Sequence, residues 1–345
     1  MKADLPAIDM MNKNLTIKDI ARLANVSQST VSKVLNDRPD VGADTKRNVL
    51  KIVEHHNFVP NATGKALKRR FTDNIGVIFR RDDNPLSNPF FSRVLEGIEA
   101  EIAFNDNNLV LYSMPEHKKP ELPRMVRERQ VDGIILVGAM NQELVRKLRK
   151  ANVPLILIDT RTSVTDCPQV LIDNENGAFR ATKYLIERGH RRIGFISGEL
   201  SIPSFTQRLN GYKKALKHYD IPVRDELIKT GGFEAGYSLT KALLQTPEIP
   251  TAIFAAYDIN ALYGYRAIHE FNLKIPDDIS IVGFDDIDLA KMAIPPLTTM
   301  RVYKEELGSV AVRNLRELIY HEAKIPETTV IPVKLVERNS VKNLH

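Results

Sequence analysis

The stretch Thr16–Asn36, TIKDIARLANVSQSTVSKVLN, predicts two short amphipathic helices around a three-residue turn. In its first half, Ile17, Ile20, Ala21 and Ala24 recur at i, i+3, i+4 and i+7. This spacing draws one apolar stripe along a helix, because about 3.6 residues make one helical turn. A helix is therefore expected from about Ile17 to Ala24.

The turn Asn25-Val26-Ser27 separates the two predicted helices. Asn tolerates the left-handed backbone, and Ser27 is a favourable N-cap for a second helix that begins at Gln28. The apolar side of this second helix leaves polar residues on the opposite side, at Gln28, Ser29, Ser32 and Lys33. Such side chains can read base edges in the major groove of DNA. The pattern is typical of a helix-turn-helix, although an ordinary helical hairpin can carry the same spacing.

The positive charge of the chain is concentrated at its N-terminal end. The first 72 of the 345 residues hold 13 of the 49 Lys and Arg and 7 of the 43 Asp and Glu. Residues 73–345 therefore carry 36 of each kind, and the formal net charge of +6 belongs to the first 72 residues. A small basic part joined to a large neutral part indicates a module that binds a polyanion, and favours nucleic acid over a membrane.

Composition excludes several other classes of protein. The longest apolar runs, such as Val153–Ile158, are much shorter than the roughly 18 residues that span a membrane. Residues 1–14 lack the features of a secretory signal peptide, and Met11 is an alternative start. A single cysteine, Cys167, excludes an intrachain disulfide and fits a reducing compartment. We therefore expect a cytoplasmic protein that does not enter a membrane.

Enzyme and metal motifs are also missing from the sequence. No GxGxxG follows a predicted strand, and Gly64-Lys65 lacks the earlier glycine of a phosphate loop. His55-His56 lacks the HExxH spacing, and the other histidines have no carboxylate or cysteine partner at the spacing of metal ligands. We expect no enzyme activity, no cofactor and no metal ion.

The N-terminal part of the chain is expected to form a helical domain followed by a hinge. A third helix over Asp44–His56 closes a three-helix core, which Phe58 seals. Residues 1–14 form an expected disordered extension, 15–59 the DNA-binding domain, and 60–73 a hinge helix and linker. Asn61 is the expected cap of the hinge helix, and Gly64 weakens that helix by about 1 kcal/mol relative to Ala.

Beyond residue 74, short apolar runs alternate with helical periods, which is the order of parallel sheets covered by helices. The apolar runs begin at Ile75, Leu109, Gly133, Leu155, Ile193, Thr251 and Ile279. The alternation restarts at about Asp173, which indicates two lobes, one of residues 74–172 and 301–335 and the other of residues 173–300. Such sheets bind ligands at the carboxyl ends of their strands, so the cleft between the lobes is the expected pocket.

These residues resemble the LacI/GalR family of bacterial transcription regulators over nearly the whole chain. Besides the helix-turn-helix, the resemblance rests on VPNATGKALKRR at Val59–Arg70, VDGIIL at Val131–Leu136, ERGHRRIGFISG at Glu187–Gly198, and the later IPDDISIVGFDD and PPLTTMR. It implies a hinge that folds on DNA and a core that dimerises and is similar to type I periplasmic binding proteins. The expected fold class is a small all-α headpiece plus an α/β core of two parallel-sheet lobes.

The resemblance assigns DNA contacts to individual positions. It implies base contacts at Gln28, Ser29 and Lys33, and backbone or hinge contacts at Thr16, Thr30, Ser32, Asn36, Asn61 and Lys68. Solvation of the helix surface is the alternative interpretation of Thr30 and Ser32. Leu67 matches the family's hinge leucine, which wedges into the minor groove, where apolar side chains kink DNA. Gly64-Lys65 departs from the common Ala-Arg, which makes this hinge more dependent on DNA for its order.

Effector contacts are likewise implied by the resemblance. They fall at Phe90, Phe91, Arg208, Phe233, Asp258 and Asp285, with Asp173 and Ser204 as secondary candidates. Carboxylates and a guanidinium can each hold two hydroxyl groups while aromatic faces cover ring carbons, so a sugar or sugar derivative fits best. Core packing is the alternative interpretation of Phe90 and Phe91. The charged run Arg80-Arg81-Asp82-Asp83 could admit a sugar phosphate.

The sequence therefore predicts a cytoplasmic transcription factor, a repressor of carbohydrate-use genes. We expect a homodimer, or a tetramer, that binds a pseudo-palindromic operator and responds to a sugar-like effector between its lobes. Two alternatives stay open. One is a sugar-binding receptor for transport or chemotaxis, which the basic headpiece opposes. The other is a regulator whose effector is a nucleobase, a sugar phosphate or a partner protein.

Overall fold

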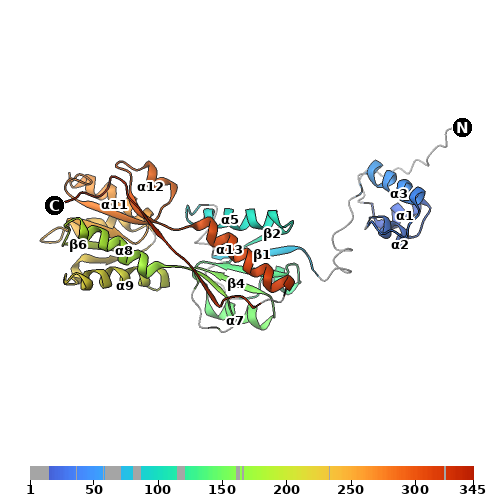
Figure 1. Ribbon diagram of the computed structural model, residues 1–345, viewed down its shortest axis with the longest axis horizontal. Coiled ribbons are helices and arrows are strands. Elements are labelled where there is room, and N and C mark those ends of the chain that lie inside the picture. The colour runs from blue at the N-terminus through green and yellow to red at the C-terminus, as the bar shows by residue number, and fades with distance from the viewer. Residues whose placement is uncertain are drawn as a thin grey trace. The chain divides into compact units, whose positions relative to one another are not determined.

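The computed structural model describes residues 15–35, 37–56, 58, 71–80, 87–114, 121–160, 164, 167–232, 234–321 and 324–345. The chain divides into two compact units, Met1–Thr72 and Asp73–His345, which we call the headpiece and the core. Figure 1 shows both units with their helices and strands. The expected extension at 1–14 and the expected hinge helix at 61–70 lie outside the described residues.

The described part of the headpiece holds three helices, α1 (Ile17–Ala24), α2 (Gln28–Leu35) and α3 (Ala43–His55). α1 begins at a capping box, in which Thr16 Oγ1 accepts the Asp19 N–H at 3.4 Å and Asp19 Oδ2 accepts the Thr16 N–H at 3.0 Å. It ends at Asn25, whose φ of 53° is left-handed. Ser27 Oγ accepts the Thr30 N–H at 3.0 Å and caps α2. The predicted helices and the turn between them are confirmed.

A single apolar cluster lies among these three helices. Its buried members come from every helix and from a residue three positions beyond α3: Ile20, Ala21, Ala24, Val31, Val34, Val49 and Phe58. Ile20, Val31 and Val49 have no exposed surface at all. The expected three-helix core is therefore confirmed, and α3 begins and ends one residue before the expected Asp44–His56.

The N-terminus of α3 lacks a side-chain cap, because its N-cap residue is Gly42. The backbone there has φ −59° and ψ 143°, which any residue can adopt, and an added Cβ would meet no atom within 4 Å. We expect Gly42→Ser to raise the free energy of opening α3 by about 0.5–1 kcal/mol, since serine caps the helix and restricts the unfolded chain. Hydrogen exchange of the α3 amides in the full chain measures the change. Gly42→Ala adds no capping hydroxyl, so it measures the effect of restricting the unfolded chain alone. If the α3 amides exchange no more slowly in Gly42→Ser than in wild type, the capping argument is wrong.

The described part of the core contains two six-stranded sheets, each of which defines a lobe. The first sheet is parallel in the order β11-β5-β4-β3-β1-β2. Its strands are β1 (Asn74–Arg80), β2 (Asn108–Met114), β3 (Gly133–Val137), β4 (Leu155–Ile158), β5 (Gln169–Ile172) and β11 (Thr328–Ile331). The second sheet, in the order β12-β10-β9-β8-β6-β7, pairs β10 with β12 antiparallel and its other neighbours parallel. Its strands are β6 (Ile193–Ser197), β7 (Ile228–Thr230), β8 (Ala252–Ala255), β9 (Ser280–Asp285), β10 (Thr298–Arg301) and β12 (Lys334–Val336).

Helices cover both faces of each sheet (Figure 1). In the first lobe, α5 (Phe91–Phe104) and α13 (Lys304–Arg316) cover one face, and α6 (Arg124–Arg127) and α7 (Gln142–Lys150) the other. In the second lobe, α8 (Asn174–Glu187) and α9 (Pro203–His218) lie opposite α10 (Gly236–Leu244) and α11 (Asp258–Glu270). The remaining short helices among the described residues of the core are η1 (Asp225–Leu227), α12 (Asp288–Met292) and the π-helix η2 (Glu317–His321). Strands β3, β4 and β8 are buried throughout, as two-sided cover requires. None of the described helices combines the length and apolar character needed to cross a membrane.

The described chain passes between the lobes from β5 to α8, from β10 to α13 and from β11 to β12. The expected end of the first lobe at residue 335 is wrong, because β12 pairs with β10 in the second sheet. Pro332 follows β11 and has no N–H to continue that strand's ladder, so the chain leaves the first sheet there. After β12 the chain stays on the second lobe, where Ser340 Oγ donates to Ile281 O at 2.6 Å.

Candidate ligand pocket and DNA-reading helix

A cavity that is partly open to solvent lies between the two lobes of the core. Its lining comes from the carboxyl ends of β1, β3 and β4 in the first lobe and of β6, β8 and β9 in the second, and from the segments that follow them. The first lobe contributes Asn88, Pro89, Phe90, Phe91, Gly138, Ala139 and Asp159. The second contributes Ile202, Ser204, Phe205, Arg208, Tyr257, Ile259, Asp285 and Ile287. Parallel α/β sheets bind their ligands at this edge, so the cavity is the candidate ligand site.

Arg208 of α9 is the buried cation of the cavity, with 3% of its surface exposed. Its Nε donates to Asn174 Oδ1 at 2.8 Å, and its Nη1 donates to Ala256 O at 2.5 Å and to Asp285 Oδ1 at 3.1 Å. The guanidinium carbon lies 3.8 Å from the ring centroid of Phe284, a cation–π contact. Nη2 has no hydrogen-bond partner among the described residues. Its two N–H groups can therefore serve a ligand.

Asp285 places a carboxylate beside this arginine at the end of β9. Its Oδ1 accepts the guanidinium, whereas its Oδ2 has no hydrogen-bond partner among the described residues. Its backbone φ of 114° is unusual for a residue other than glycine, and such strain persists where neighbouring contacts hold it. Lys304 provides two such contacts, because its Nζ donates to Asp285 O at 2.6 Å and to Asp286 O at 3.1 Å. Since Lys304 begins α13, it ties this turn of the second lobe to the first lobe.

Asp258 lies beneath this turn and does not line the cavity. It is completely buried, with Oδ1 accepting the Thr299 hydroxyl at 2.6 Å and Oδ2 accepting the Ile287 N–H at 2.9 Å. Position 283 is glycine because a Cβ there would lie 2.1 Å from Asp258 Oδ1. Burial, reinforced by the charge of Asp285, raises the pKa of Asp258 to about 8. The expectation that Asp258 contacts the effector is therefore wrong, because both of its carboxyl oxygens are hydrogen-bonded within the protein and support the turn.

The raised pKa of Asp258 makes the stability of the core fall as pH rises. The unfolded carboxyl ionises near 3.8 and the folded one near 8, so between these values the folded protein holds a proton that the unfolded chain lacks. In Asp258→Asn the amide oxygen can still accept the Ile287 N–H, and the amide NH2 can donate to the Thr299 hydroxyl oxygen in a reversed bond. Because the variant carries no charge at this position, we expect it to melt at a higher temperature than wild type at about pH 8. The fall in melting temperature between about pH 5 and 8 should also be smaller in the variant. If the melting temperatures of wild type and variant change in parallel over this pH range, Asp258 does not hold a proton in the folded protein.

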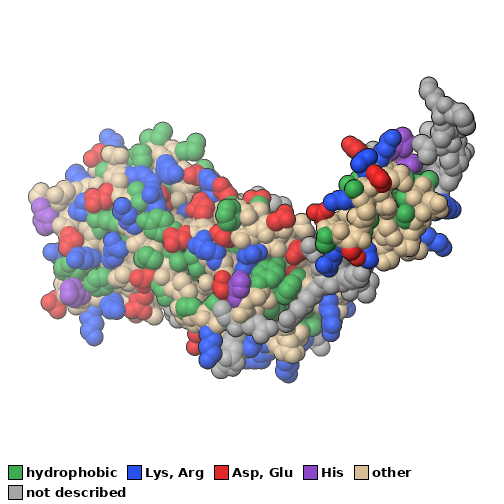
Figure 2. All heavy atoms as spheres, turned by 45° about the vertical axis from the view of Figure 1, so that its right-hand side comes forward, with side chains coloured by type: hydrophobic (Ala, Val, Ile, Leu, Met, Phe, Trp, Pro, Cys, Tyr) green, Lys and Arg blue, Asp and Glu red, His purple; other side chains and the backbone are tan. Residues whose placement is uncertain are grey.

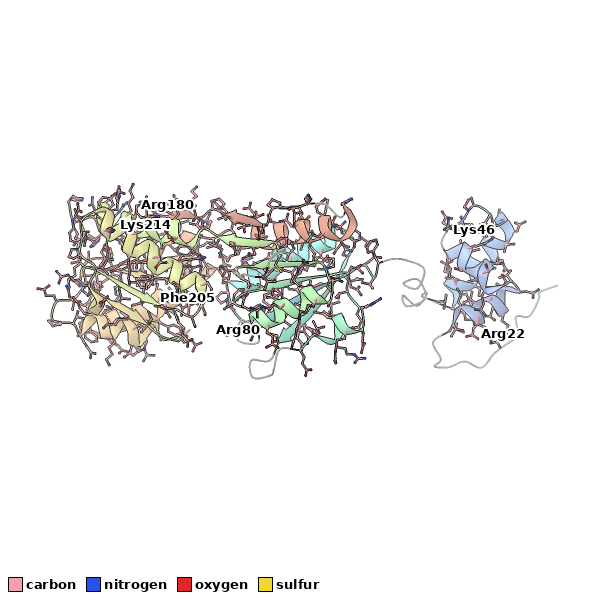
Figure 3. All side chains as sticks on the ribbon, turned by 90° about the horizontal axis from the view of Figure 1, so that it is seen from below. Arg22, Lys46, Arg80, Arg180, Phe205 and Lys214 are labelled. Atoms are coloured by element: carbon pink, nitrogen blue, oxygen red, sulfur yellow. The ribbon has the colours of Figure 1, made fainter. Side chains whose placement is uncertain are left out.

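Aromatic rings line the cavity on both lobes. Phe90 and Phe91 meet edge to face with their centroids 5.2 Å apart, and Phe91 also packs on Phe79 at 6.1 Å. In the second lobe, Phe205 stacks on Tyr257 with centroids 5.1 Å apart and ring planes 26° apart. Figure 3 shows Phe205 near the end of the second lobe that faces the first. The two phenylalanines of the first lobe therefore both pack on neighbours and face the cavity.

The expected effector residues do not all reach the cavity. Those that line it are Phe90, Phe91, Ser204, Arg208 and Asp285. Asp173 does not line it, because this residue precedes α8 at a crossing between lobes, where its Oδ2 accepts Asn176 Nδ2 at 2.9 Å. Phe233 and the run at 81–83 lie outside the described residues. Polar and aromatic lining residues that were not expected are Asn88, Asp159, Phe205 and Tyr257. Their position after the carboxyl end of a predicted strand is the signal that could have found them.

The polar side of α2 carries the expected base-reading positions. Gln28, Ser29 and Lys33 are all exposed. The Lys33 Nζ lies 2.6 Å from Asp40 Oδ2, and 46% of the lysine side chain is accessible. These three side chains can therefore approach DNA, and Asp40 engages the ammonium of Lys33 on that side of α2.

The residues expected to contact phosphate are hydrogen-bonded or partly buried within the headpiece. The Thr16 hydroxyl donates to Asp19 Oδ2 at 2.6 Å, so a phosphate there competes with the cap of α1. The Thr30 hydroxyl lies 2.8 Å from Ser27 Oγ, and Ser32 is half-buried on α2. The other expected DNA contacts, Asn36, Asn61, Leu67 and Lys68, lie outside the described residues.

The surface of the core mixes both signs of charge. Figure 2 shows Lys and Arg interspersed with Asp and Glu over the visible face of the core, and residues 73–345 hold equal numbers of basic and acidic residues. No group of three His, Cys, Asp or Glu within the described ranges is arranged to hold a metal ion.

A helix-turn-helix unit joined to a two-lobed core with a polar cavity defines a DNA-binding regulator with a ligand-binding core. Two family models match the chain, "Bacterial regulatory proteins, lacI family" over residues 16–61 and "Periplasmic binding protein-like domain" over residues 182–341. The chain is 35% identical to Catabolite control protein A of Priestia megaterium, over 95% of this chain and 100% of that protein. The chain thus belongs to the lacI family of bacterial regulatory proteins.

Solved structures agree with this assignment over nearly the whole chain. The lac repressor dimer bound to operator and the anti-inducer ONPF is similar with a TM-score of 0.84 and 27% identity, covering 96% of this chain and 100% of that one. The complex of the transcriptional regulator CelR with cellobiose is similar with a TM-score of 0.71 and 28% identity, covering 94% and 99%. The predicted family, fold class and role as a DNA-binding transcriptional regulator are confirmed.

Proposed function

We propose that this chain represses genes for carbohydrate use, and that a sugar or sugar derivative bound between its lobes controls its affinity for operator DNA. The observation that carries the proposal is the pair of Arg208 and Asp285. Both residues line the cavity, and Nη2 of the one and Oδ2 of the other lack a partner among the described residues. A charged donor and a charged acceptor side by side suit two neighbouring hydroxyl groups of a sugar ring.

The other lining residues favour the same class of ligand. The stacked rings of Phe205 and Tyr257 offer an apolar surface to the C–H groups of a sugar, and Asn88, Asp159 and Ser204 add polar groups around it. The similar regulator CelR was solved with a sugar, cellobiose, which supports the proposal.

Control of DNA binding requires that the effector favour one arrangement of the lobes over another. The cavity takes residues from both lobes, and contacts of two charged side chains also join them. Lys304 of α13 holds the carbonyl groups of Asp285 and Asp286, and Arg93 of α5 pairs with Asp288 of α12. A coupling free energy of about 1–3 kcal/mol changes operator affinity by about 5–150-fold. Residues 60–73 join the core to the headpiece, so a change in the arrangement of the lobes reaches the headpiece through this segment.

DNA binding is proposed to need two copies of the chain in the cytoplasm. A homodimer presents two headpieces to the two half-sites of a pseudo-palindromic operator, because protein and operator then share a two-fold axis. The similar lac repressor is a dimer bound to operator, which supports this arrangement. Within each headpiece, Gln28, Ser29 and Lys33 are the proposed base contacts.

Thermal unfolding of the purified chain with a panel of metabolites tests the ligand class. We expect at least one monosaccharide or disaccharide to raise the melting temperature, since a ligand that binds only the folded core stabilises it. Sugar phosphates and nucleobases form the comparison arms of the panel. A shift with a nucleobase and none with any sugar would overturn the choice of a sugar.

A further inference from the structure

The loop between α2 and α3 carries two aspartates, and each pairs with a lysine of a neighbouring helix. Asp40 Oδ2 lies 2.6 Å from Nζ of Lys33 on α2. Asp37 Oδ1 pairs with Nζ of Lys46 on α3, which is labelled in Figure 3. Both pairs are exposed and join the same kinds of group. They differ in that Lys33 lies on the proposed base-reading side of α2, whereas Lys46 lies on another helix.

The backbone of the loop keeps Asp40 beside Lys33. The Arg38 N–H donates to Lys33 O at 3.0 Å, which anchors the start of the loop to the last turn of α2. Val41 is half-buried and packs on the apolar core of the headpiece, which anchors the residue after Asp40. The hydrogen bond from Lys33 lowers the pKa of Asp40, so this carboxylate is ionised at neutral pH. The ammonium of Lys33 is thus neutralised by a carboxylate that the fold itself positions.

We infer that Asp40 is a specificity-determining residue of the headpiece: it retains the Lys33 ammonium on non-operator DNA and releases it to the acceptor edge of a guanine in the operator. The inference rests on the proposed base-reading role of Lys33. A guanine presents two acceptors, O6 and N7, to one lysine in the major groove. A phosphate offers a charge without sequence information. Guanine is therefore the partner whose replacement of the carboxylate depends on the DNA sequence.

The effect of this pair falls mainly on binding to random sequences. Non-specific affinity comes from lysines and arginines that neutralise phosphates and release counterions. A Lys33 that stays paired with Asp40 adds no net charge to that contact, and the carboxylate itself repels phosphates. In the operator complex Lys33 has left Asp40, so the loss of this carboxylate matters less there. Removing its charge should therefore raise non-specific affinity more than operator affinity.

Binding of full-length Asp40→Asn to two duplexes tests the inference. One duplex is enriched from a random pool by the wild-type chain, and the other is a mixed-sequence duplex of equal length. We expect affinity for the mixed-sequence duplex to rise about fivefold at low salt, the size of a surface ion-pair effect. The slope of log affinity against log salt should steepen by about one for that duplex. The preference for the enriched duplex should fall several-fold.

Asp37→Asn is the matched control, because it removes the same charge from the same loop without touching Lys33. We expect it to change the affinity for both duplexes alike and to leave their ratio unchanged. In a Lys33→Met background, Asp40→Asn should no longer change the ratio. If Asp40→Asn and Asp37→Asn act alike, the effect is one of net charge and the inference is overturned. A wild-type chain that binds both duplexes equally would instead contradict the proposed function.

Discussion

Arg208→Lys is expected to lower the affinity for the sugar effector by about 100-fold or more while DNA binding persists. Lysine keeps a positive charge beside Asp285, so the buried carboxylate is not left without a counter-charge. It cannot reproduce the planar fork that donates to Asn174 and Ala256 and leaves Nη2 for the ligand. The variant loses the two hydrogen bonds that the Nη2 N–H groups of Arg208 would donate to the ligand. At about 1.5–3 kcal/mol for each bond to a charged group, their loss corresponds to at least a 100-fold fall in affinity. Calorimetric titration with the sugar that stabilises the wild type measures the effect.

Arg224→Lys is the matched control, because it makes the same change at an exposed arginine that does not line the cavity. It should bind the sugar with wild-type affinity. Thermal unfolding without sugar should show that Arg208→Lys is folded at the temperature of the titration. Wild-type sugar affinity in Arg208→Lys would remove Arg208 from the ligand site and with it the observation that carries the proposed function.

Lys33→Ala is expected to erase the preference for one base pair in each half-site of the operator. A lysine that reaches both acceptors of a guanine contributes about 1–3 kcal/mol of discrimination, or roughly 5–150-fold per half-site. The exposed position of Lys33 on α2 allows that contact once Asp40 releases it. Repeating the selection from random DNA with the variant measures the change, because the affected position loses its base preference in the enriched sequences.

Lys46→Ala serves as the comparison, since it removes a paired lysine from α3 instead of α2. We expect this variant to enrich the same sequence as the wild type. An unchanged enriched sequence for Lys33→Ala, with a uniform loss of affinity, would show that Lys33 contacts phosphate and not a base.

The helix-turn-helix could be predicted from the sequence because its causes are local. The apolar stripe of α1, the left-handed Asn25 and the capping Ser27 all lie within one short stretch, and each acts on residues three or four positions away. The buried strands were predictable for a similar reason, since sheets covered on both faces need continuous apolar runs. The pairing of β12 with β10 was not, because it joins segments more than 30 residues apart and is set by neither segment alone.

The sequence predicts the location of the cavity between the lobes, but only part of the set of residues that line it. Arg208 and Asp285 came from the family resemblance, and both line it. Asp258 came from the same source, yet its carboxylate is used by Thr299 and the Ile287 N–H, which a linear sequence does not reveal. Asn88 and Tyr257 lie just before α5 and α11, and the backbone at these helix starts brings them to the cavity. Asparagine and tyrosine are common in many surroundings, so neither residue type by itself indicates a ligand contact.

A sugar in the cavity is proposed to change the affinity of the headpiece for DNA. Titrating the operator complex of the full-length chain with the sugar that raises its melting temperature tests this claim directly. We expect the operator dissociation constant to change by at least about fivefold at saturating sugar in the wild type, and not in Arg208→Lys at the same sugar concentration. An operator dissociation constant that stays the same while sugar saturates the wild-type core would contradict the coupling of pocket and headpiece.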